Sequence, residues 1–514
     1  MKRISLLFAV TFLALNFATA QIQEKEVDEL VQNTMKTFNV PGIAVGIIKD
    51  GKLVLAKGYG VSNIKTNQKV DANTLFGIAS NSKAFTTASL AILVDESKIN
   101  WDDKVIQYLP EFKMYNEYVT KEFTIRDLLT HRSGLGLGAG DLMIWPDGHD
   151  FTPKDIVKNI QFLKPISGFR TKYDYDNLLY VIAGEVIEKV SGKYWNDFVE
   201  DRLMKPMEMS NSASSWNRLK DTTNVIVPHV PTNGKLEIVP RYTNSIFDAA
   251  AGLYTSVNDL SHWLIMQMND GNYNGKQLFS KEQHDEMWTS QTILPIRNSY
   301  PYTTNFRTYG LGWQLTDFNG HLQVSHTGGL DGIVTQTIMF PNEKLGIIVL
   351  TNQQSGTAFN VISNTIKDSY LGFPKFDHLA YLSEERASKE DDADKITNEV
   401  WAKVNQNAKD RNLKIDVKKY IGTFKDNWFG EVTISEKKGK LYFSSKRSKR
   451  LIGEIFLHND QNFIVKWNVR SFNADAHLFF KLDANGNASH FTMKAISPLT
   501  DFSYDFHDLN FTKI

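Results

Sequence analysis

The chain has 514 residues, with 58 basic and 58 acidic side chains and therefore no formal net charge. This length is enough for two or three domains with well-filled cores. Because a nucleic-acid partner requires a basic face, the balanced charge argues against one. The absence of cysteine excludes disulfides, thiolate metal sites, thiol catalysis and a lipidated cysteine anchor.

Residues 1–20 are predicted to be a secretory signal peptide. Two basic residues precede an apolar run over residues 4–17, and Ala-Thr-Ala at residues 18–20 has the pattern of a cleavage site. We therefore expect a mature chain that starts at Gln21 and is exported, to the periplasm or the medium. No later apolar run approaches the ~20 residues that a membrane helix needs, so we expect no transmembrane segment after signal removal.

The next region, residues 21–372, mixes helical and strand patterns. Asp50-Gly51 lies between two short apolar segments, which predicts a β-hairpin. Helical spacing of apolar residues predicts helices over 27–38, 84–94, 124–129, 153–161, 178–190, 257–268 and 356–370. Strands are expected at 43–48, 53–56, 312–315, 322–326, 334–340 and 345–351. Strands at both ends of the region predict one antiparallel sheet, flanked by helices, with a helical subdomain inserted between its sequence-distant halves. The fold class is α/β (α+β).

The C-terminal part divides into a charged segment and a strand-rich segment. Residues 373–412 are typical of a linker or a solvated helix. Over residues 413–514, short strands alternate with turn signals such as Asn485-Gly486, which predicts a small antiparallel barrel or sandwich. Trp428, Phe429 and Trp467 are expected to fill its core.

Ser80 and Lys83 begin the predicted helix over 84–94. Residues three apart share one helix face, so the lysine amine could serve as base for a serine nucleophile. Ser-x-x-Lys also occurs at Ser62 and Ser435, so the motif alone is weak. A helix N-cap for Ser80 and a solvated charge for Lys83 are the alternatives.

Tyr175-Asp176-Asn177 precedes the predicted helix over 178–190. The Tyr175 phenol could share a proton with Lys83, and Asn177 could hydrogen-bond Lys83 or a substrate amide. The alternative for Tyr175 is a half-buried structural tyrosine.

His326-Thr327-Gly328-Gly329 lies where an apolar strand is expected to end. Glycines there would let a ligand carbonyl approach backbone N–H groups closely. A structural histidine is the alternative for His326.

In chain order, the motifs Ser-x-x-Lys, Tyr-x-Asn and His-Thr-Gly resemble the serine β-lactamase and penicillin-recognising superfamily. The resemblance is to its class C β-lactamase-like branch, which includes D-alanyl-D-alanine carboxypeptidases, D-aminopeptidases and esterases. Further landmarks at residues 124–135, 252–260 and 309–313 extend the resemblance over about residues 25–370. From Tyr420 onward the chain resembles a barrel-like, lipocalin-like domain that is often appended to these hydrolases.

The resemblance implies a β-lactamase-like fold and a serine-hydrolase site without metal or cofactor. Ser80 would form an acyl-enzyme, Lys83 would act as base and Tyr175 would relay protons. The backbone N–H groups of Ser80 and Gly329 would form the oxyanion hole. The substrate would contact Asn177, His326, Thr327, Gly328 and Gly329.

Two departures from the family pattern bear on the substrate. His326 stands where classical members have lysine, which weakens the case for binding a free carboxylate. Asp176 stands where serine is usual, and its charge could favour a positively charged substrate end. We therefore expect a peptidase, such as a D-aminopeptidase or carboxypeptidase-like enzyme, acting on a small peptide or D-amino-acid derivative. An esterase, a β-lactamase, or a non-catalytic protein that binds cell-wall peptides on this scaffold are the alternatives.

Two further patterns in the sequence do not predict sites. The glycine-rich residues 134–140 do not match a dinucleotide-binding loop and are expected to form a mobile loop. The histidines show no H-E-x-x-H or similar ligand pair, so no metal site is predicted.

Overall fold

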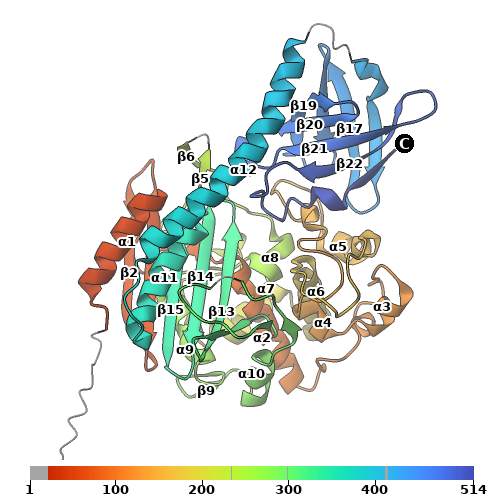
Figure 1. The fold of residues 1–514 in the computed structure, drawn as a ribbon. Coiled ribbons are helices and arrows are strands. Elements are labelled where there is room, and N and C mark those ends of the chain that lie inside the picture. The colour runs from red at the N-terminus through yellow and green to blue at the C-terminus, as the bar shows by residue number, and fades with distance from the viewer. Residues whose placement is uncertain (1–20, 233, 298, 411–414) are drawn as a thin grey trace, which may run out of the picture.

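The computed structural model describes residues 21–232, 234–297, 299–410 and 415–514 (Figure 1). The predicted signal peptide lies outside these ranges. Within them, none of the helices combines the length and the apolar character needed to cross a bilayer.

A nine-stranded antiparallel sheet forms the centre of the first domain. Its β1–β2 hairpin turns at Asp50 and Gly51, which both have positive φ (51° and 74°), as the Asp-Gly pattern predicts. β1 also pairs along its whole length with β15, about 300 residues later in the chain. The predicted closure of the sheet by sequence-distant segments is therefore confirmed. In spatial order the strands are β10 (Thr292–Ile293), β11 (Arg307–Tyr309), β12 (Gln314–Phe318), β13 (His321–Leu330), β14 (Ile333–Phe340), β15 (Leu345–Thr351), β1 (Gly42–Lys49), β2 (Lys52–Asn63) and β3 (Gln68–Lys69).

Helices cover both faces of this sheet (Figure 1). α1 (Glu24–Phe38) and α11 (Gly356–Leu371) pack on one face, against the odd-numbered apolar residues of β1 such as Val45. α9 (Val257–Gln267) packs on the other face, where Gly46 leaves room for it, since a Cβ there would lie 2.6 Å from Val257. Because successive side chains of β1 point to opposite faces of the sheet, its odd-numbered residues contact α1 and α11, and its even-numbered residues lie on the face of α9.

The helical subdomain surrounds α2 (Ser82–Asp95). Every residue of α2 from Ser82 to Leu93 is buried. The hydroxyls of its buried Thr86, Thr87 and Ser89 donate to main-chain carbonyls, which replace the water that they lose. Phe85 stacks on Trp263 of α9, with ring centroids 3.8 Å apart. The other helices of the region are α3 (Glu117–Glu122), α4 (Ile125–Leu129), α5 (Pro153–Asn159), α6 (Leu178–Ser191), α7 (Trp195–Val199), α8 (Asp248–Ala251) and α10 (Lys281–Met287).

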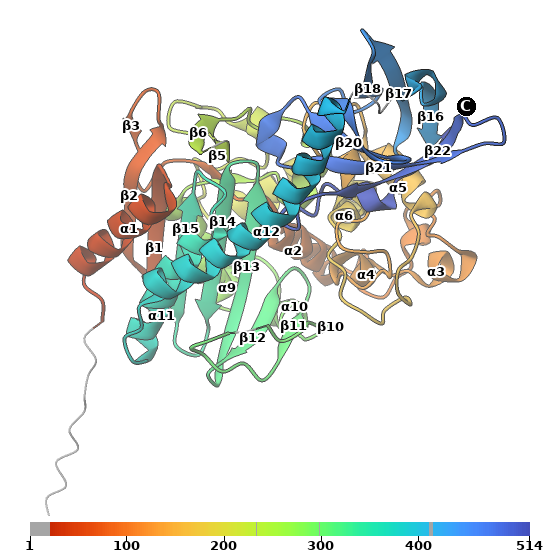
Figure 2. The ribbon, with the colours of Figure 1, turned by 45° about the horizontal axis from the view of Figure 1, so that its top comes forward.

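A single helix, α12 (His378–Lys409), runs from the first domain to the second (Figures 1 and 2). Its 32 residues correspond to a length of about 48 Å. Only three of its residues are buried, as the charged sequence predicts. At its far end Asn407 Nδ2 donates to the carbonyls of Leu457 (3.2 Å) and His458 (2.6 Å), which attaches the helix to the barrel.

The second domain is a closed antiparallel barrel of eight strands. Pairing of the first strand with the last closes it. Trp428, Phe429 and Trp467 are buried, as predicted, and a central group of rings packs around Phe491, with Phe511 at 4.6 Å. The strands are β16 (Gly422–Asp426), β17 (Gly430–Lys437), β18 (Lys440–Ser445), β19 (Ile452–Asn459), β20 (Asn462–Trp467), β21 (Ala476–Leu482), β22 (Ala488–Ala495) and β23 (Asn510–Lys513).

Several elements differ from the sequence-based expectation. β13 continues through Leu330 instead of ending at residue 326, so the His-Thr-Gly-Gly segment lies within the strand. The strand expected at 312–315 begins two residues later, at Gln314. β10 and β11 were not predicted, because two or three residues are too short to show an alternating pattern.

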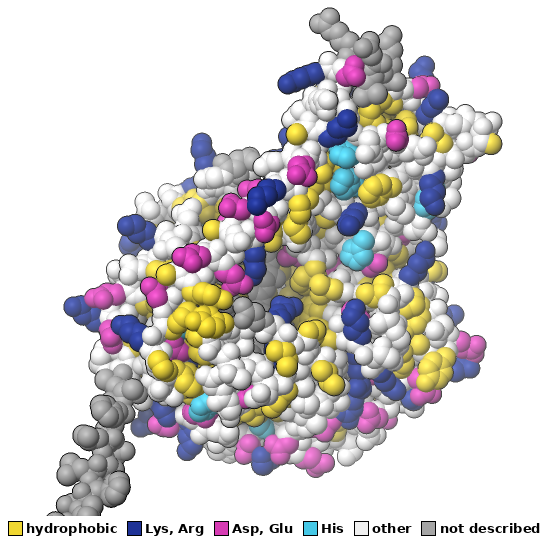
Figure 3. All heavy atoms as spheres, in the orientation of Figure 1, with side chains coloured by type: hydrophobic (Ala, Val, Ile, Leu, Met, Phe, Trp, Pro, Cys, Tyr) yellow, Lys and Arg dark blue, Asp and Glu magenta, His cyan; other side chains and the backbone are white. Residues whose placement is uncertain are grey.

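The surface carries both signs of charge. On the face shown in Figure 3, Lys and Arg side chains are interspersed with Asp and Glu side chains. No single-sign patch dominates that face, in keeping with the balanced composition.

Candidate active site

Ser80 lies in a one-turn 3₁₀ helix, η1 (Ala79–Asn81), that leads directly into α2. Ala79 has a left-handed backbone (φ 49°), which costs a non-glycine residue about 1–2 kcal/mol. Neighbouring contacts hold the turn in place. The Asn81 amide donates to Thr335 Oγ1 (2.9 Å) and accepts from Thr337 Oγ1 (2.7 Å), which fixes η1 against β14.

Lys83 is fully buried and has three polar neighbours. Its Nζ lies 3.0 Å from Ser80 Oγ, 2.7 Å from Asn177 Oδ1 and 3.1 Å from the Ala250 carbonyl. The amide and main-chain carbonyl oxygens can only accept hydrogen bonds. They therefore take the two N–H groups of a neutral amine and leave its lone pair for the Ser80 hydroxyl.

The electrostatics of the site favour that neutral amine. Burial lowers the pKa of Lys83 to about 7, although Asp141 and Asp176 oppose the shift. Burial also raises the pKa of Asp141 to about 7. Asp141 is a site residue that the sequence-based prediction missed, because no local pattern marks it.

Asn177 connects Lys83 to Asp141. While its Oδ1 accepts from Lys83, its Nδ2 donates to Asp141 Oδ2 at 2.7 Å. The bond to Asp141 determines which end of the amide faces the lysine. The structure thus places Asn177 beside the lysine rather than in an open substrate site.

Tyr175 lies over the same lysine. Lys83 Nζ is 4.9 Å from the centroid of its ring, and the ring of His131 lies 4.2 Å away on centroids. Burial raises the pKa of Tyr175 well above its ordinary value, while a contact with the Ser80 hydroxyl opposes the rise. At neutral pH Tyr175 is therefore a phenol that can donate a proton.

Asp176 has a different role from the one predicted. It is fully buried, and its Oδ1 accepts from the N–H of Leu178 at 2.9 Å, where α6 begins. Burial also raises its pKa well above the ordinary value, so its charged form is disfavoured. The hypothesis that Asp176 selects a positively charged substrate end is therefore wrong, because the carboxyl serves the start of a helix inside the protein.

His326 is buried and neutral. Its Nδ1 lies 2.6 Å from the Thr327 carbonyl, which can only accept, so Nδ1 carries the proton and Nε2 accepts from the Tyr309 hydroxyl at 2.9 Å. Burial lowers the pKa of His326 to about 3. The structure thus places no cation at this position.

β13 passes the Ser80 turn and then has an open edge. β12 pairs with β13 only as far as Ser325, so residues 326–330 extend beyond it. Thr327 and Gly329 are exposed, whereas Gly328 faces η1. A Cβ on Gly328 would lie 2.2 Å from the Ile78 carbonyl, so only glycine allows this approach.

The glycine-rich loop over residues 134–140 was expected to be mobile, and that prediction is wrong. Most of the loop is buried. Gly138 N–H donates to the Tyr175 carbonyl at 2.7 Å, and Gly140 N–H donates to the carboxylate of Asp505 at 2.6 Å. Asp505 lies in the second domain, so no pattern within residues 134–140 could reveal this hydrogen bond.

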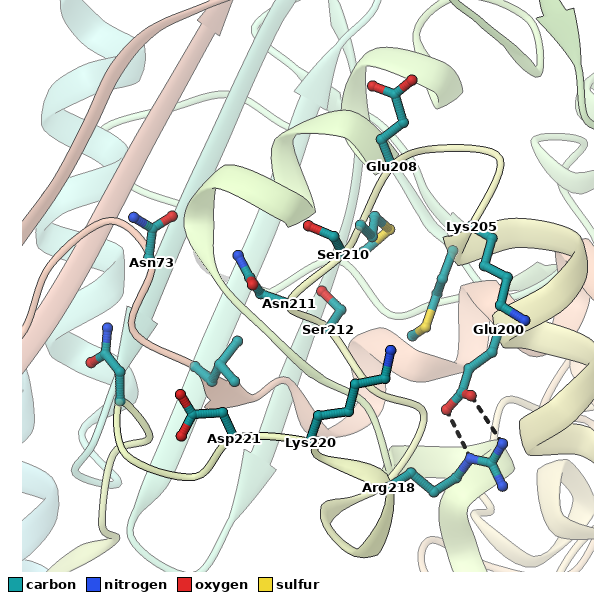
Figure 4. Close-up of a pocket in the computed structure, with 14 residues that line it drawn as sticks. Asn73, Glu200, Lys205, Glu208, Ser210, Asn211, Ser212, Arg218, Lys220 and Asp221 are labelled. Carbon is teal, nitrogen blue, oxygen red and sulfur yellow. Dashed lines mark hydrogen bonds and ion pairs between the residues drawn. The ribbon is translucent and has the colours of Figure 1, made fainter.

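Other clusters lie outside this site. A pocket of about 640 Å³ contains the Arg218–Glu200 ion pair, and Lys220 points into it (Figure 4). None of the predicted site residues lines it. Three side chains that could hold a metal ion also come together, but Lys281 already pairs with two of them, Asp270 and Asp285.

Models of two known protein families match the two domains of this chain. The Beta-lactamase family model matches residues 27–370, and a domain of unknown function, DUF3471, matches residues 409–513. The chain belongs to the β-lactamase family. Members of this family are generally serine hydrolases, and Ser80 lies within the matched region.

Relatives of this β-lactamase-family chain include fungal and bacterial proteins. It is 28% identical to the unguisins hydrolase ungD' of Aspergillus campestris, over 66% of this chain and 62% of that protein. It is 27% identical to protein flp of Staphylococcus aureus, over 65% of this chain and 64% of that protein. The chain thus spans less than two thirds of the length of the curated relatives it matches.

A solved structure shares the fold. The octameric penicillin-binding protein homologue from Pyrococcus abyssi aligns with a TM-score of 0.62 and 21% identity, over 96% of this chain and 100% of that chain. The β-lactamase-like fold and the appended barrel are therefore both shown.

Proposed function

We propose that this chain is an exported serine hydrolase that cleaves amide bonds of small peptides through an acyl-enzyme on Ser80. The observation that carries the proposal is the 3.0 Å contact between Ser80 Oγ and the buried Lys83 Nζ. A buried amine with a pKa of about 7 is a competent base at neutral pH. The two carbonyl acceptors on Lys83 direct its lone pair to the nucleophile.

The proposed reaction has two stages. Lys83 takes the proton of Ser80 as Oγ bonds to the substrate carbonyl carbon, and the N–H groups of Ser80 and Gly329 stabilise the oxyanion. Tyr175 then gives its proton to the departing amine as the C–N bond breaks, and takes the proton that Lys83 holds. In the second stage Lys83 takes a proton from water as the water oxygen bonds to the acyl carbon. That proton passes to Ser80 Oγ as the ester bond breaks and the acid leaves.

Two features support a peptide substrate. The open edge of β13 over residues 326–330 can hydrogen-bond the main chain of an extended peptide. Neutral His326 supplies no cation for a free carboxylate, which favours an aminopeptidase or an enzyme that cleaves within a short peptide. A relative named as a hydrolase of unguisins is consistent with hydrolysis on this scaffold.

Export is part of the same proposal and has its own measurement. The basic start, apolar run and Ala-Thr-Ala of residues 1–20 support a cleaved signal. N-terminal sequencing of the protein from the periplasm or medium is expected to begin at Gln21. An intact N-terminus on a protein that stays in the cytoplasm would contradict export.

The reaction is tested by labelling and by a substrate panel. Mass spectrometry after treatment with a fluorophosphonate is expected to find one adduct, on Ser80, and Ser80→Ala is expected to abolish both adduct and hydrolysis. The panel comprises D-amino-acid amides, short peptides, nitrocefin and p-nitrophenyl acetate. Efficient turnover of nitrocefin alone would replace the peptidase assignment with a β-lactamase, and p-nitrophenyl acetate alone would replace it with an esterase. Unchanged hydrolysis in Ser80→Ala would overturn the proposed mechanism.

A further inference from the structure

A segment of the barrel domain reaches the site described above. Residues 501–505 lie in the connection between β22 and β23, and Ser503 Oγ donates to Asp141 Oδ2 at 2.9 Å. Both residues are buried, Asp141 completely and Ser503 to nine-tenths. The contact joins positions 362 residues apart in the chain.

This contact extends the hydrogen bonds that begin at Ser80. Ser80 contacts Lys83, Lys83 donates to Asn177, Asn177 donates to Asp141, and Asp141 also accepts from Ser503. Ser503 and Asn177 share the same carboxylate oxygen of Asp141. The hydroxyl therefore helps to hold the carboxylate that orients the amide on Lys83.

A second residue of the segment holds the main chain on both sides of Asp141. The carboxylate of Asp505 accepts from the N–H of Gly140 at 2.6 Å and of Leu142 at 3.2 Å. Asp505 is fully buried, and burial raises the pKa of its carboxyl group well above the ordinary value while these two bonds oppose the rise. The bonds replace part of the water that the group loses. The second domain thus holds Asp141 by two sets of hydrogen bonds. Ser503 bonds to the Asp141 side chain, and Asp505 bonds to the main chain on either side of it.

A third residue of the segment lies against Tyr175. The ring of Phe502 packs edge-on to the ring of Tyr175 with centroids 5.9 Å apart. Gly138 makes room for it, because a Cβ there would lie 2.7 Å from Phe502 Cδ2. Phe502 is nevertheless 38% exposed, and nearby Leu137 and Leu499 are 47% and 48% exposed.

Exposed apolar side chains beside a reacting group favour an apolar ligand group over water. Partly exposed Phe502 packs on Tyr175, which donates the proton to the leaving group in the proposed reaction. A substrate bound at Ser80 would therefore bring its side chain close to this surface.

We propose that the barrel domain supplies part of the active site. Ser503 is a positioning residue that holds Lys83 through Asp141 and Asn177. Phe502 is a specificity residue that favours substrates with an apolar side chain next to the scissile bond. This inference rests on the proposed function and names the substrate class that the same site prefers.

The positioning role is tested with Ser503→Ala in the full-length protein. The variant is expected to lower kcat by about two- to tenfold, as for the loss of one ordinary hydrogen bond, with KM unchanged. Ser503→Thr retains the hydroxyl and is expected to restore most of kcat. Ser489→Ala is the matched control, since the Ser489 hydroxyl bonds to the Lys481 carbonyl on the barrel hairpin.

The specificity role is tested with Phe502→Ala on peptide amides that differ only in the side chain next to the scissile bond. KM is expected to rise about tenfold for leucine or phenylalanine substrates and to change little for alanine substrates, as for lost contact in an apolar pocket. Phe479→Ala is the matched control, because Phe479 on the barrel is 39% exposed, close to the 38% of Phe502.

The outcomes separate this inference from the proposed function. If the wild-type protein is labelled at Ser80 and hydrolyses peptides, while Ser503→Ala and Phe502→Ala match it, the inference is overturned and the function stands. If Ser503→Ala loses activity and Ser503→Thr does not recover it, the positioning role is also overturned. No adduct on wild-type Ser80 would instead overturn the proposed function.

Discussion

Lys83 shows how burial and bonding geometry together can make a base. Two of its three neighbours can only accept hydrogen bonds, so the lone pair of the neutral amine is left to accept the bond that the Ser80 hydroxyl donates. Its pKa of about 7 results from burial, with Asp141 and Asp176 acting in the opposite direction. The protonation state of this one amine is expected to set the pH dependence of the proposed hydrolysis.

We predict that kcat/KM rises as pH rises through about 7. Below that pH Lys83 is an ammonium ion that cannot accept the Ser80 proton, and above it the neutral base predominates. Asn177→Asp would place a second carboxyl group beside Asp141, and the pair would share one proton and keep one negative charge beside Nζ. This charge is expected to stabilise the ammonium form and to move the acidic limb upward by about one pH unit.

The pH profile of kcat/KM, measured for both proteins, checks this prediction. Asn485→Asp, at an exposed turn of the barrel, adds the same charge far from Lys83 and is expected to leave the limb in place. A limb that does not move in Asn177→Asp would show that another group controls the acidic side.

At the scale of elements, β13 passes close to η1, so the two segments that carry the proposed oxyanion donors, Ser80 and Gly329, are neighbours. Gly328 lies against the Ile78 carbonyl of the turn, so a Cβ there would be only 2.2 Å from the carbonyl oxygen. A Cβ on Gly329, the next residue, would be 4.0 Å from its nearest neighbouring atom. Thr335 on β14 also donates to the Ile78 carbonyl at 2.9 Å. The strand and the turn are therefore held at a distance that only glycine permits.

We predict that Gly328→Ala lowers the free energy of unfolding by about 1–3 kcal/mol, as for other overpacked sites. The added methyl would lie 2.2 Å from the Ile78 backbone oxygen, so β13 and η1 must separate. Activity is expected to fall with stability because the oxyanion donors move apart.

Thermal unfolding of Gly328→Ala and Gly329→Ala checks this. Gly329→Ala is the adjacent control, because its Cβ fits without contact closer than 4.0 Å, and its unfolding temperature is expected to match the wild type. Equal unfolding temperatures for the two variants would contradict the packing argument.

At the scale of the whole molecule, the two domains are joined by α12 and by direct contacts across their interface. Arg447 of the barrel pairs with Asp150 at 2.6 Å and with Asp155 at 3.0 Å, and its guanidinium stacks on Phe151 at 3.8 Å. Asn159 Nδ2 also donates to the Trp428 carbonyl at 3.0 Å. These contacts hold the barrel beside α5 (Figure 2). Segment 501–505 of the barrel in turn contacts Asp141 and Gly140 of the first domain.

We predict that Arg447→Ala loosens this docking, lowers kcat/KM severalfold and increases hydrogen exchange at the amides of Gly140 and Leu142. Those amides donate to Asp505, so they lose protection when the barrel moves away. Hydrogen-exchange mass spectrometry and steady-state kinetics on the full-length variant measure both effects.

Lys446→Ala is the control for this experiment. Lys446 is the neighbouring cation, but it pairs with Glu431 of the same barrel at 2.9 Å and its side chain is 70% exposed. Its removal is expected to change neither exchange nor kinetics. Equal effects of the two variants would show that the interface does not control the site.

Local sequence patterns were enough to predict much of the architecture. The Asp50-Gly51 hairpin, the apolar helix after Ser80, the solvated character of the charged segment and the all-β C-terminal domain follow from spacing, turn residues and charge, which act over a few residues. The pairing of Ser80 with Lys83 likewise follows from helical geometry. Each of these features depends on neighbours in the chain.

The tertiary structure alone decided the surroundings of these residues. Asp141, Ser503 and Asp505 carry no local signal, and their partners lie up to 365 residues away. The tertiary structure also decided the protonation of His326 and the role of Asp176. Burial keeps His326 neutral, and the fold places the Asp176 carboxyl where it accepts from the Leu178 N–H at the start of α6. Desolvation and long-range hydrogen bonds depend on what the folded chain brings together, and the sequence around each residue does not contain that information.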